Sequence, residues 1–152
     1  MKQPRKGRLL TKKELKQLAD RIKRSLWRRK HPLDGYWSIG RIFRTVIGPP
    51  YGKIMMRRIT RSAGINPTTL YNCVRFYSRW PSRKQLEDLI AKDVLWSHVL
   101  SLLQRWLSDK DRETLVRYIA KHHPTCTAFR DKVRAKVRAK KINARKKGLK
   151  CP

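Results

Sequence analysis

The chain has 152 residues, and its 40 Lys and Arg residues outnumber its 10 Asp and Glu residues, which gives a formal net charge of +30. An excess of cationic side chains this large favours a polyanionic partner. No run of about 18 apolar residues is present, and the basic amino terminus lacks the apolar stretch of a secretory signal. The three cysteines, an odd number at scattered positions, fit reduced thiols better than disulfides. We therefore expect a cytoplasmic protein without a membrane partner.

The basic residues are concentrated at the two ends of the chain. No acidic residue follows Asp131, whereas the middle of the chain holds four of the five Trp residues and both signs of charge. Aromatic anchors together with both charges are typical of a folded domain. We predict three parts: a basic N-terminal arm and helix over residues 1–31, a helical core over residues 32–131 and a basic C-terminal tail over residues 132–152.

An amphipathic helix is predicted over residues 11–30, where apolar side chains recur at three- and four-residue steps. Thr11 and Glu14 have the spacing of a capping box, in which each side chain bonds the backbone N–H of the other residue. We expect Pro32 to end this helix, because the residue before a proline is pushed out of helical geometry. A turn over residues 34–35 should follow.

The rest of the chain is predicted to be helical as well, with proline and glycine residues as breakers between segments. Asn66 is a favoured helix cap, and Pro67 is favoured at the first helical position. The expected helices cover residues 38–47, 51–63, 67–79, 83–92, 96–107 and 111–122, and a last one runs from residue 127 into the tail. No segment alternates with a period of two residues for long enough to form a strand. The predicted fold class is therefore all-α, a compact helical domain with basic helical arms at both ends.

Residues 56–77 have the pattern of a helix-turn-helix. Gly64 falls at the turn, and apolar residues occupy the inward positions of both segments. The outward side chains are amides, hydroxyls and guanidinium groups, which read base edges or hold phosphates. The candidate contacts are Arg57, Arg58 and Arg61 before the turn and Asn66, Thr68, Thr69, Tyr71, Asn72, Arg75 and Arg79 after it. The alternative is a packed pair of helices with no role in binding.

The tail carries a second candidate surface. Phe129, Val133 and Val137 form a narrow apolar stripe at four-residue steps, and basic residues cover the other faces. We expect this segment to lie along phosphates, where each contact releases counterions and makes binding salt-dependent; the alternative is a solvated tail. The stripe is too narrow to insert strongly into a membrane surface. The candidate contacts are Lys132, Arg134, Lys136, Arg138, Lys140, Lys141, Arg145, Lys146 and Lys147.

No catalytic site, metal site or cofactor is predicted. The acids within residues 109–113 fit a helix start, where negative charge complements the helix dipole. His122 and His123, with the cysteines that follow, lack the spacing of a common closed zinc site. Ser97 and His98 have no third partner for a catalytic arrangement, and we expect His98 to pack or hydrogen-bond in the core. No glycine-rich phosphate loop is present.

Four short motifs together resemble a known family. They are YWSIGRI at 36–42, YGK at 51–53, VRFYSRW at 74–80 and LWSHVLSLL at 95–103. Over roughly residues 36–121, the chain is similar to the amino-terminal domain of YhcG-type bacterial proteins. This resemblance implies a helical, DNA-binding domain, which in that family precedes a nuclease domain of the PDDEXK class. Only a short basic segment follows the core here, so we expect this chain to act without that nuclease domain.

These observations predict a non-enzymatic DNA-binding protein associated with a prokaryotic nucleoid. The helix-turn-helix would enter the major groove, and the basic arms would hold the phosphate backbone. A separately encoded effector enzyme is a candidate protein partner. The alternative is an RNA-binding subunit of a ribonucleoprotein, in which Trp27, Trp37 and Trp80 are candidates for stacking on bases, although burial is the commoner role for Trp.

Overall fold

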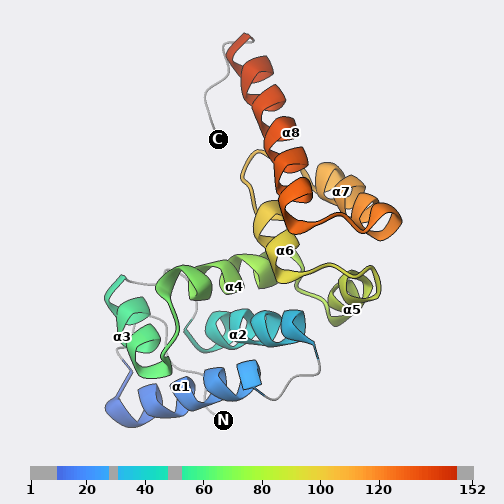
Figure 1. Cartoon of the computed structure of the whole chain (residues 1–152). Helices are drawn as coiled ribbons and strands as arrows, with labels where there is room; N and C mark the ends of the chain where they lie inside the picture. Colours follow the sequence, from blue (N-terminus) through green and yellow to red (C-terminus); the bar gives the residue numbers. More distant parts are fainter. Residues whose placement is uncertain (1–9, 28–30, 48–52, 147–152) are drawn as a thin grey trace. The chain divides into compact units, whose positions relative to one another are not determined.

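The structure is a computed structural model that describes residues 10–27, 31–47 and 53–146 (Figure 1). These residues form eight helices and contain no strand, so the predicted all-α class is confirmed. In chain order the helices are α1 (Lys12–Trp27), α2 (Pro32–Ile47), α3 (Lys53–Ala63), α4 (Pro67–Arg79), α5 (Arg83–Ala91), α6 (Trp96–Leu102), α7 (Asp109–His122) and α8 (Cys126–Lys146). None of these helices has the length and apolarity needed to cross a membrane.

The chain forms two compact units, Met1–Leu86 and Glu87–Pro152, and α5 spans the division between them. The predicted boundaries at residues 31 and 131 do not coincide with this division. The first lies between α1 and α2, which pack on each other within one unit. The second falls inside α8, a continuous helix with buried apolar side chains on both sides of that position. Local excess of charge therefore does not mark the ends of the folded units.

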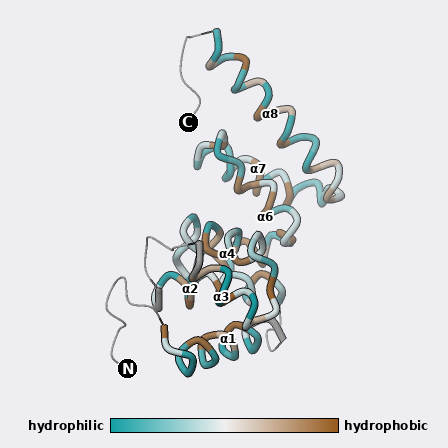
Figure 2. The backbone as a smooth tube through the Cα atoms, turned by 90° about the vertical axis from the view of Figure 1, so that its left-hand side faces the viewer, coloured by the Kyte–Doolittle hydropathy of each residue, from teal (hydrophilic) through white to brown (hydrophobic). Residues whose placement is uncertain are grey.

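In the first unit, α2 lies between α1 and α4, and α3 also packs on α1 (Figure 1). Leu18, Ala19 and Ile22 of α1 are buried, as are Ile39 and Phe43 of α2. Figure 2 shows the hydrophobic segments of α1 on the side toward α2, with hydrophilic segments on the opposite side. The amphipathic pattern of α1 therefore serves the core of this unit.

The start of α1 has the predicted capping box. The Thr11 backbone N–H donates to Glu14 Oε2 at 2.8 Å, and the Glu14 backbone N–H donates to Thr11 Oγ1 at 3.2 Å. Two N–H groups that have no partner inside the helix are satisfied in this way. The local sequence alone is therefore sufficient to place this helix end.

The start of α2 differs from the prediction. α2 begins at Pro32, so the predicted turn over residues 34–35 is wrong. Proline suits the first helical position, because its fixed φ is helical and its missing N–H would have no partner there. Asp34, in the first turn, is buried and forms an ion pair with Arg83, a distant residue of the same unit. This pairing favours the helical conformation where the local Asp-Gly sequence favours a turn.

α2 and α4 cross at Gly40. A Cβ atom there would lie 2.1 Å from the Cys73 carbonyl oxygen and 2.8 Å from Tyr77 Cβ. Both distances are shorter than a van der Waals contact, so only glycine lets the two helices approach this closely. The Trp37 indole N–H also donates to the Trp80 carbonyl oxygen at 2.6 Å. These contacts hold the second half of α4 against α2.

In the second unit, α6 packs on α8, and a buried arginine of α7 ties α7 to the segment around the end of α6. Arg112 is 4% exposed. Its Nε donates to the Leu102 carbonyl oxygen at 2.9 Å and its Nη2 to the Gln104 carbonyl oxygen at 3.0 Å. Its Nη1 pairs with Asp109 at 3.1 Å. A guanidinium group with partners on all three nitrogens can be buried without an unpaired donor group.

His98 lies in the core of the second unit, as predicted. It is 2% exposed, its Nδ1 accepts from the Leu95 backbone N–H at 3.3 Å, and its ring meets the Phe129 ring edge-on at 4.9 Å between centres. Burial lowers the pKa of His98, and the backbone of Pro124 opposes this effect only in part. The neutral ring is therefore the form that the fold favours.

Asp111 connects the start of α7 to α8. Its Oδ2 accepts from the Ser108 backbone N–H at 2.8 Å, in a capping box with the Ser108 hydroxyl, so the predicted role of this acid at a helix start is confirmed. The same carboxylate pairs with Lys136 at 3.1 Å and with Lys140. Burial raises the pKa of the Asp111 carboxyl, but Lys140, Ser108 and Lys136 outweigh it and hold the pKa well below its usual range.

Candidate nucleic-acid interface

α3 and α4 are joined by a turn of three residues. The first is Gly64, whose φ of +66° lies in the left-handed region that favours glycine. The backbone N–H of Ile65 then donates to the Thr60 carbonyl oxygen at 3.1 Å, which satisfies an end carbonyl of α3. The predicted glycine at the turn is confirmed, and it fixes the direction in which the chain leaves α3.

Asn66 closes the turn as the cap of α4. Its Oδ1 accepts from the Thr68 backbone N–H at 2.8 Å, and Pro67 occupies the first turn of the helix. This cap and this proline agree with the prediction. Asn66 also belongs to the predicted binding residues, and the structure shows that its side-chain oxygen has a structural partner.

α4 has a polar side opposite its buried side. Leu70, Cys73, Val74 and Phe76 are buried. Successive residues of a helix are rotated by about 100°, so residues three or four positions apart lie on the same side. The polar residues of α4 that point outward have this spacing. They are Thr68, Tyr71 and Arg79, which are exposed, and Asn72 and Arg75, which are half-buried. Thr69 is half-buried and lies beside the buried face. The first five residues define the α4 stripe.

One exposed large side chain of the α4 stripe is aromatic. Tyr71 is 50% exposed, and the Arg75 guanidinium carbon lies 5.6 Å from the centre of the Tyr71 ring. This cation–π contact holds an aromatic ring and a positive charge next to each other at the surface. The pair offers both a stacking surface and a phosphate or base contact.

Three predicted arginines lie on one side of α3. Arg57 and Arg61 are exposed and Arg58 is half-buried, whereas Ile59 and Ala63 are buried. Neither α3 nor α4 contains an acidic residue. The two helices therefore present positive charge without a carboxylate of their own to neutralise it.

The predicted residues of the tail divide into two groups on α8. Lys132, Arg134, Arg138, Lys141, Arg145 and Lys146 are exposed, and Lys147 lies outside the described residues. Lys132 lies over the Tyr118 ring at 4.1 Å from its centre. Lys136 and Lys140, in contrast, are half-buried and pair with Asp111. The structure therefore gives these two lysines an internal partner, which the prediction did not foresee.

Arg130 is a basic surface residue that the sequence analysis missed. It is exposed, and it precedes Arg134, Arg138, Lys141 and Arg145 at three- and four-residue steps on α8. We name these five residues the α8 stripe. At about 1.5 Å of rise per residue, the α8 stripe extends over roughly 22 Å. The same spacing, followed toward the amino terminus, would have revealed Arg130.

The structure does not place an exposed ring at either of the two predicted stacking tryptophans whose side chains it describes. Trp37 is 3% exposed, so it cannot stack on a nucleic-acid base. Trp80 is half-buried and meets the Phe76 ring edge-on. The side chain of Trp27 lies outside the described residues. Burial against α4 explains the Trp37 position, because its indole N–H has its hydrogen-bond partner there.

The fold defines an all-α protein with two helical units and strongly basic helix surfaces. No family model, curated protein or solved structure matches the chain. Within the part of the chain that the structure describes, no three His, Cys, Asp or Glu side chains are close enough together to hold a metal ion. The function is therefore inferred from the chain's own residues.

Proposed function

We propose that the chain is a non-enzymatic DNA-binding protein that places the α4 stripe in the major groove of a duplex. One observation carries this proposal: a helix that follows a three-residue turn exposes amide, hydroxyl and guanidinium groups on the side opposite its buried face. The second helix of a DNA-binding helix-turn-helix has this arrangement. The absence of carboxylates from α3 and α4 favours a phosphate-bearing partner.

The residues of this surface have separate roles in the proposal. Asn72 suits adenine and Arg75 suits guanine, because each can form paired hydrogen bonds with that base. Arg57 and Arg61, on the preceding helix, hold phosphates and fix the protein on the duplex. The α8 stripe adds phosphate contacts that do not depend on sequence.

The resemblance to the YhcG-type amino-terminal domain supports the same class of function. The proposal includes a cytoplasmic, nucleoid-associated location and a separate effector enzyme as the protein partner. In this arrangement the chain supplies recognition, and the effector supplies the chemistry.

RNA binding is the second candidate function, and the Tyr71–Arg75 pair favours it. An exposed aromatic ring beside a guanidinium group is suited to an unstacked base, which single-stranded RNA loops provide. In this case the protein is a ribonucleoprotein subunit, and the α4 stripe contacts splayed bases instead of a groove.

Fluorescence anisotropy with two DNA duplexes tests the proposal. One duplex carries a sequence that this protein selects from a random pool, and the other carries a random sequence. We expect Asn72→Ala and Arg75→Ala each to cost about 1–3 kcal/mol on the selected duplex and much less on the random one. Arg61→Ala should weaken both duplexes and reduce the salt slope by about 0.9.

Lys84→Ala is the matched control, because Lys84 is an exposed lysine of α5 outside the proposed surface. It should change neither affinity by more than about 0.5 kcal/mol. Equal losses on both duplexes for Asn72→Ala and Arg75→Ala would contradict base reading by α4. A loss for Lys84→Ala as large as that for Arg61→Ala would show that only the overall charge matters.

A further inference from the structure

A pocket in the second unit lies between α6 and α8. Its volume is about 310 Å³, near the lower end of the roughly 300–1,000 Å³ typical of small-molecule sites. Its walls are formed by Ser97, Leu100, Ser101, Gln104, Cys126, Thr127, Arg130, Val133 and Arg134. The pocket has room for a phosphate group together with an attached group of nucleoside size.

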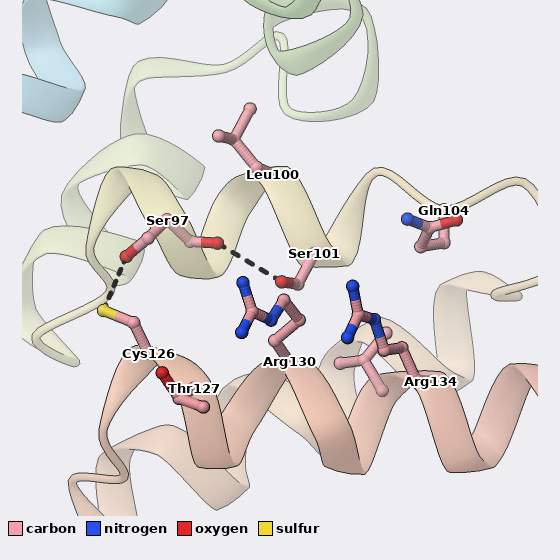
Figure 3. A pocket seen from close by; sticks show the side chains of 9 residues that line it. Ser97, Leu100, Ser101, Gln104, Cys126, Thr127, Arg130 and Arg134 are labelled. Atoms are coloured by element: carbon pink, nitrogen blue, oxygen red, sulfur yellow. Dashed lines mark hydrogen bonds between the residues drawn. The ribbon is translucent and has the colours of Figure 1, made fainter.

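The charged groups of the pocket are both positive. Figure 3 shows the guanidinium groups of Arg130 and Arg134 extending from α8 toward α6. Arg130 makes no ion pair or hydrogen bond with another described residue, and Arg134 has a long contact of 3.6 Å with Asp131, which does not line the pocket. Guanidinium groups form paired hydrogen bonds with phosphate oxygens, so two of them four residues apart can hold one phosphate group from one side.

The remaining walls add neutral polar groups. Ser97, Ser101 and Thr127 contribute hydroxyl groups, whereas Val133 is 1% exposed and the Leu100 side chain points away from α8 in Figure 3. The Ser97 hydroxyl is 2.8 Å from the Cys126 sulfur, and the Ser101 hydroxyl donates to the Ser97 carbonyl oxygen at 3.3 Å (Figure 3). The Ser101 proton is used in this bond, so two guanidinium groups and the hydroxyls of Ser97 and Thr127 remain for a ligand. These groups exceed what the two oxygens of a carboxylate can use, whereas a phosphate has more oxygens and therefore suits this set better.

We propose that the pocket between α6 and α8 binds a nucleotide phosphate, which Arg130 and Arg134 hold, while the attached nucleoside lies against the uncharged wall that includes Ser97, Ser101 and Gln104. The phosphate can belong to a free nucleotide or to a nucleic-acid strand. The pocket shares Arg130 and Arg134 with the α8 stripe, but it does not depend on duplex binding by α4, because all its lining residues belong to the second unit.

Alkylation of Cys126 gives a readout that is specific to the pocket. Total binding is uninformative, since a chain with a net charge of +30 attracts any phosphate. Cys126 is exposed and lines the pocket, whereas burial raises the pKa of the Cys73 thiol to about 12, which leaves that thiol unreactive. The full chain is treated with iodoacetamide, a neutral reagent, and modification of Cys126 is followed by mass spectrometry of its peptide.

The rate is measured with thymidine 5′-monophosphate, thymidine and inorganic phosphate at constant ionic strength. We expect saturable protection by thymidine 5′-monophosphate, weaker protection by inorganic phosphate and none by thymidine. Arg130→Gln should raise the concentration for half-protection about tenfold, the size expected for loss of one charge-assisted contact. Arg117→Gln removes the same charge from an exposed position on α7 and should leave that concentration unchanged.

A single-stranded oligothymidylate distinguishes the two sources of the phosphate. If the oligomer protects Cys126 at a lower concentration of nucleotide units than thymidine 5′-monophosphate does, a strand is the ligand. If the monophosphate protects at the lower concentration, a free nucleotide is the ligand. The proposal is overturned if neither protects Cys126, if thymidine protects as well as its monophosphate, or if Arg117→Gln has the same effect as Arg130→Gln. Duplex binding by α4 is not involved in any of these outcomes.

Discussion

Replacement of Gly40 by alanine tests the helix crossing that supports the α4 stripe. Two opposing effects decide the sign of the change. In an exposed helix interior, Gly→Ala stabilises by about 1 kcal/mol, because alanine loses less backbone entropy on folding. At Gly40 the added Cβ would lie 2.1 Å from the Cys73 carbonyl oxygen and 2.8 Å from Tyr77 Cβ.

The steric effect should exceed the propensity effect at this position. The closest atom belongs to the backbone of α4, so no side-chain rotation relieves the clash, and the helices must separate by about 1 Å or more to restore a normal contact distance. Overpacking of this kind costs about 3 kcal/mol at the upper end of its usual range. After the gain of about 1 kcal/mol from propensity, we expect a net loss of about 2 kcal/mol.

Native-state hydrogen exchange, read by peptide, measures this change in the first unit alone. A loss of about 2 kcal/mol should accelerate exchange of the most protected α2 and α4 amides about thirtyfold. Peptides from α8, in the second unit, provide the internal control and should exchange at an unchanged rate. Unchanged or slower exchange in α4 would refute the close crossing, since alanine would then contribute only its helix propensity.

Three further predictions concern other positions. Gly64→Ala should lower the free energy of unfolding by about 1 kcal/mol, measured by thermal unfolding, because alanine is strained at φ +66°. No steric clash adds to this cost, since nothing lies within 4 Å of the new Cβ. Asp111→Asn should destabilise the second unit by about 1 kcal/mol in urea unfolding, since it removes the charge that pairs with Lys136 and Lys140, whose side chains are 36% and 37% exposed and therefore partly solvated. The depressed pKa of Asp111 means that this contribution is present above the ordinary value of 3.8 and is lost as the pH falls below it. Because burial lowers the pKa of His98, its neutral form stabilises the second unit fully above the ordinary value of 6.5 and less as the pH falls below it. Thermal unfolding between pH 7.5 and 5 should show this loss, and His98→Asn should reduce it.

Local signals in the sequence were sufficient for much of the first unit. The Thr11–Glu14 capping box and the Asn66–Pro67 helix start were predicted, because the atoms that form them are within a few residues of one another. The prediction for the start of α2 was wrong, and the reason is also local. Proline ends one helix and begins the next, and the sequence analysis used only the first of these properties at Pro32.

The role of the basic tail could not be predicted in the same way. The apolar stripe of α8 was recognised, but its burial depends on α6, which lies far away in the sequence. The pairing of Lys140 with Asp111 joins residues 29 positions apart, and nothing local distinguishes this lysine from Lys141. Charge density alone therefore predicted an arm where the structure has a packed helix with one basic side.

The proposed function requires that the chain prefer duplex DNA to other nucleic acids. A labelled random duplex, bound at about physiological salt, is challenged with unlabelled duplex DNA, single-stranded DNA and a structured RNA of the same length. The lengths must match, because charge alone makes every polyanion bind. We predict that duplex DNA competes best. A structured RNA that competes tenfold better, which is about 1.4 kcal/mol, would contradict groove binding by α4 and would indicate a ribonucleoprotein subunit.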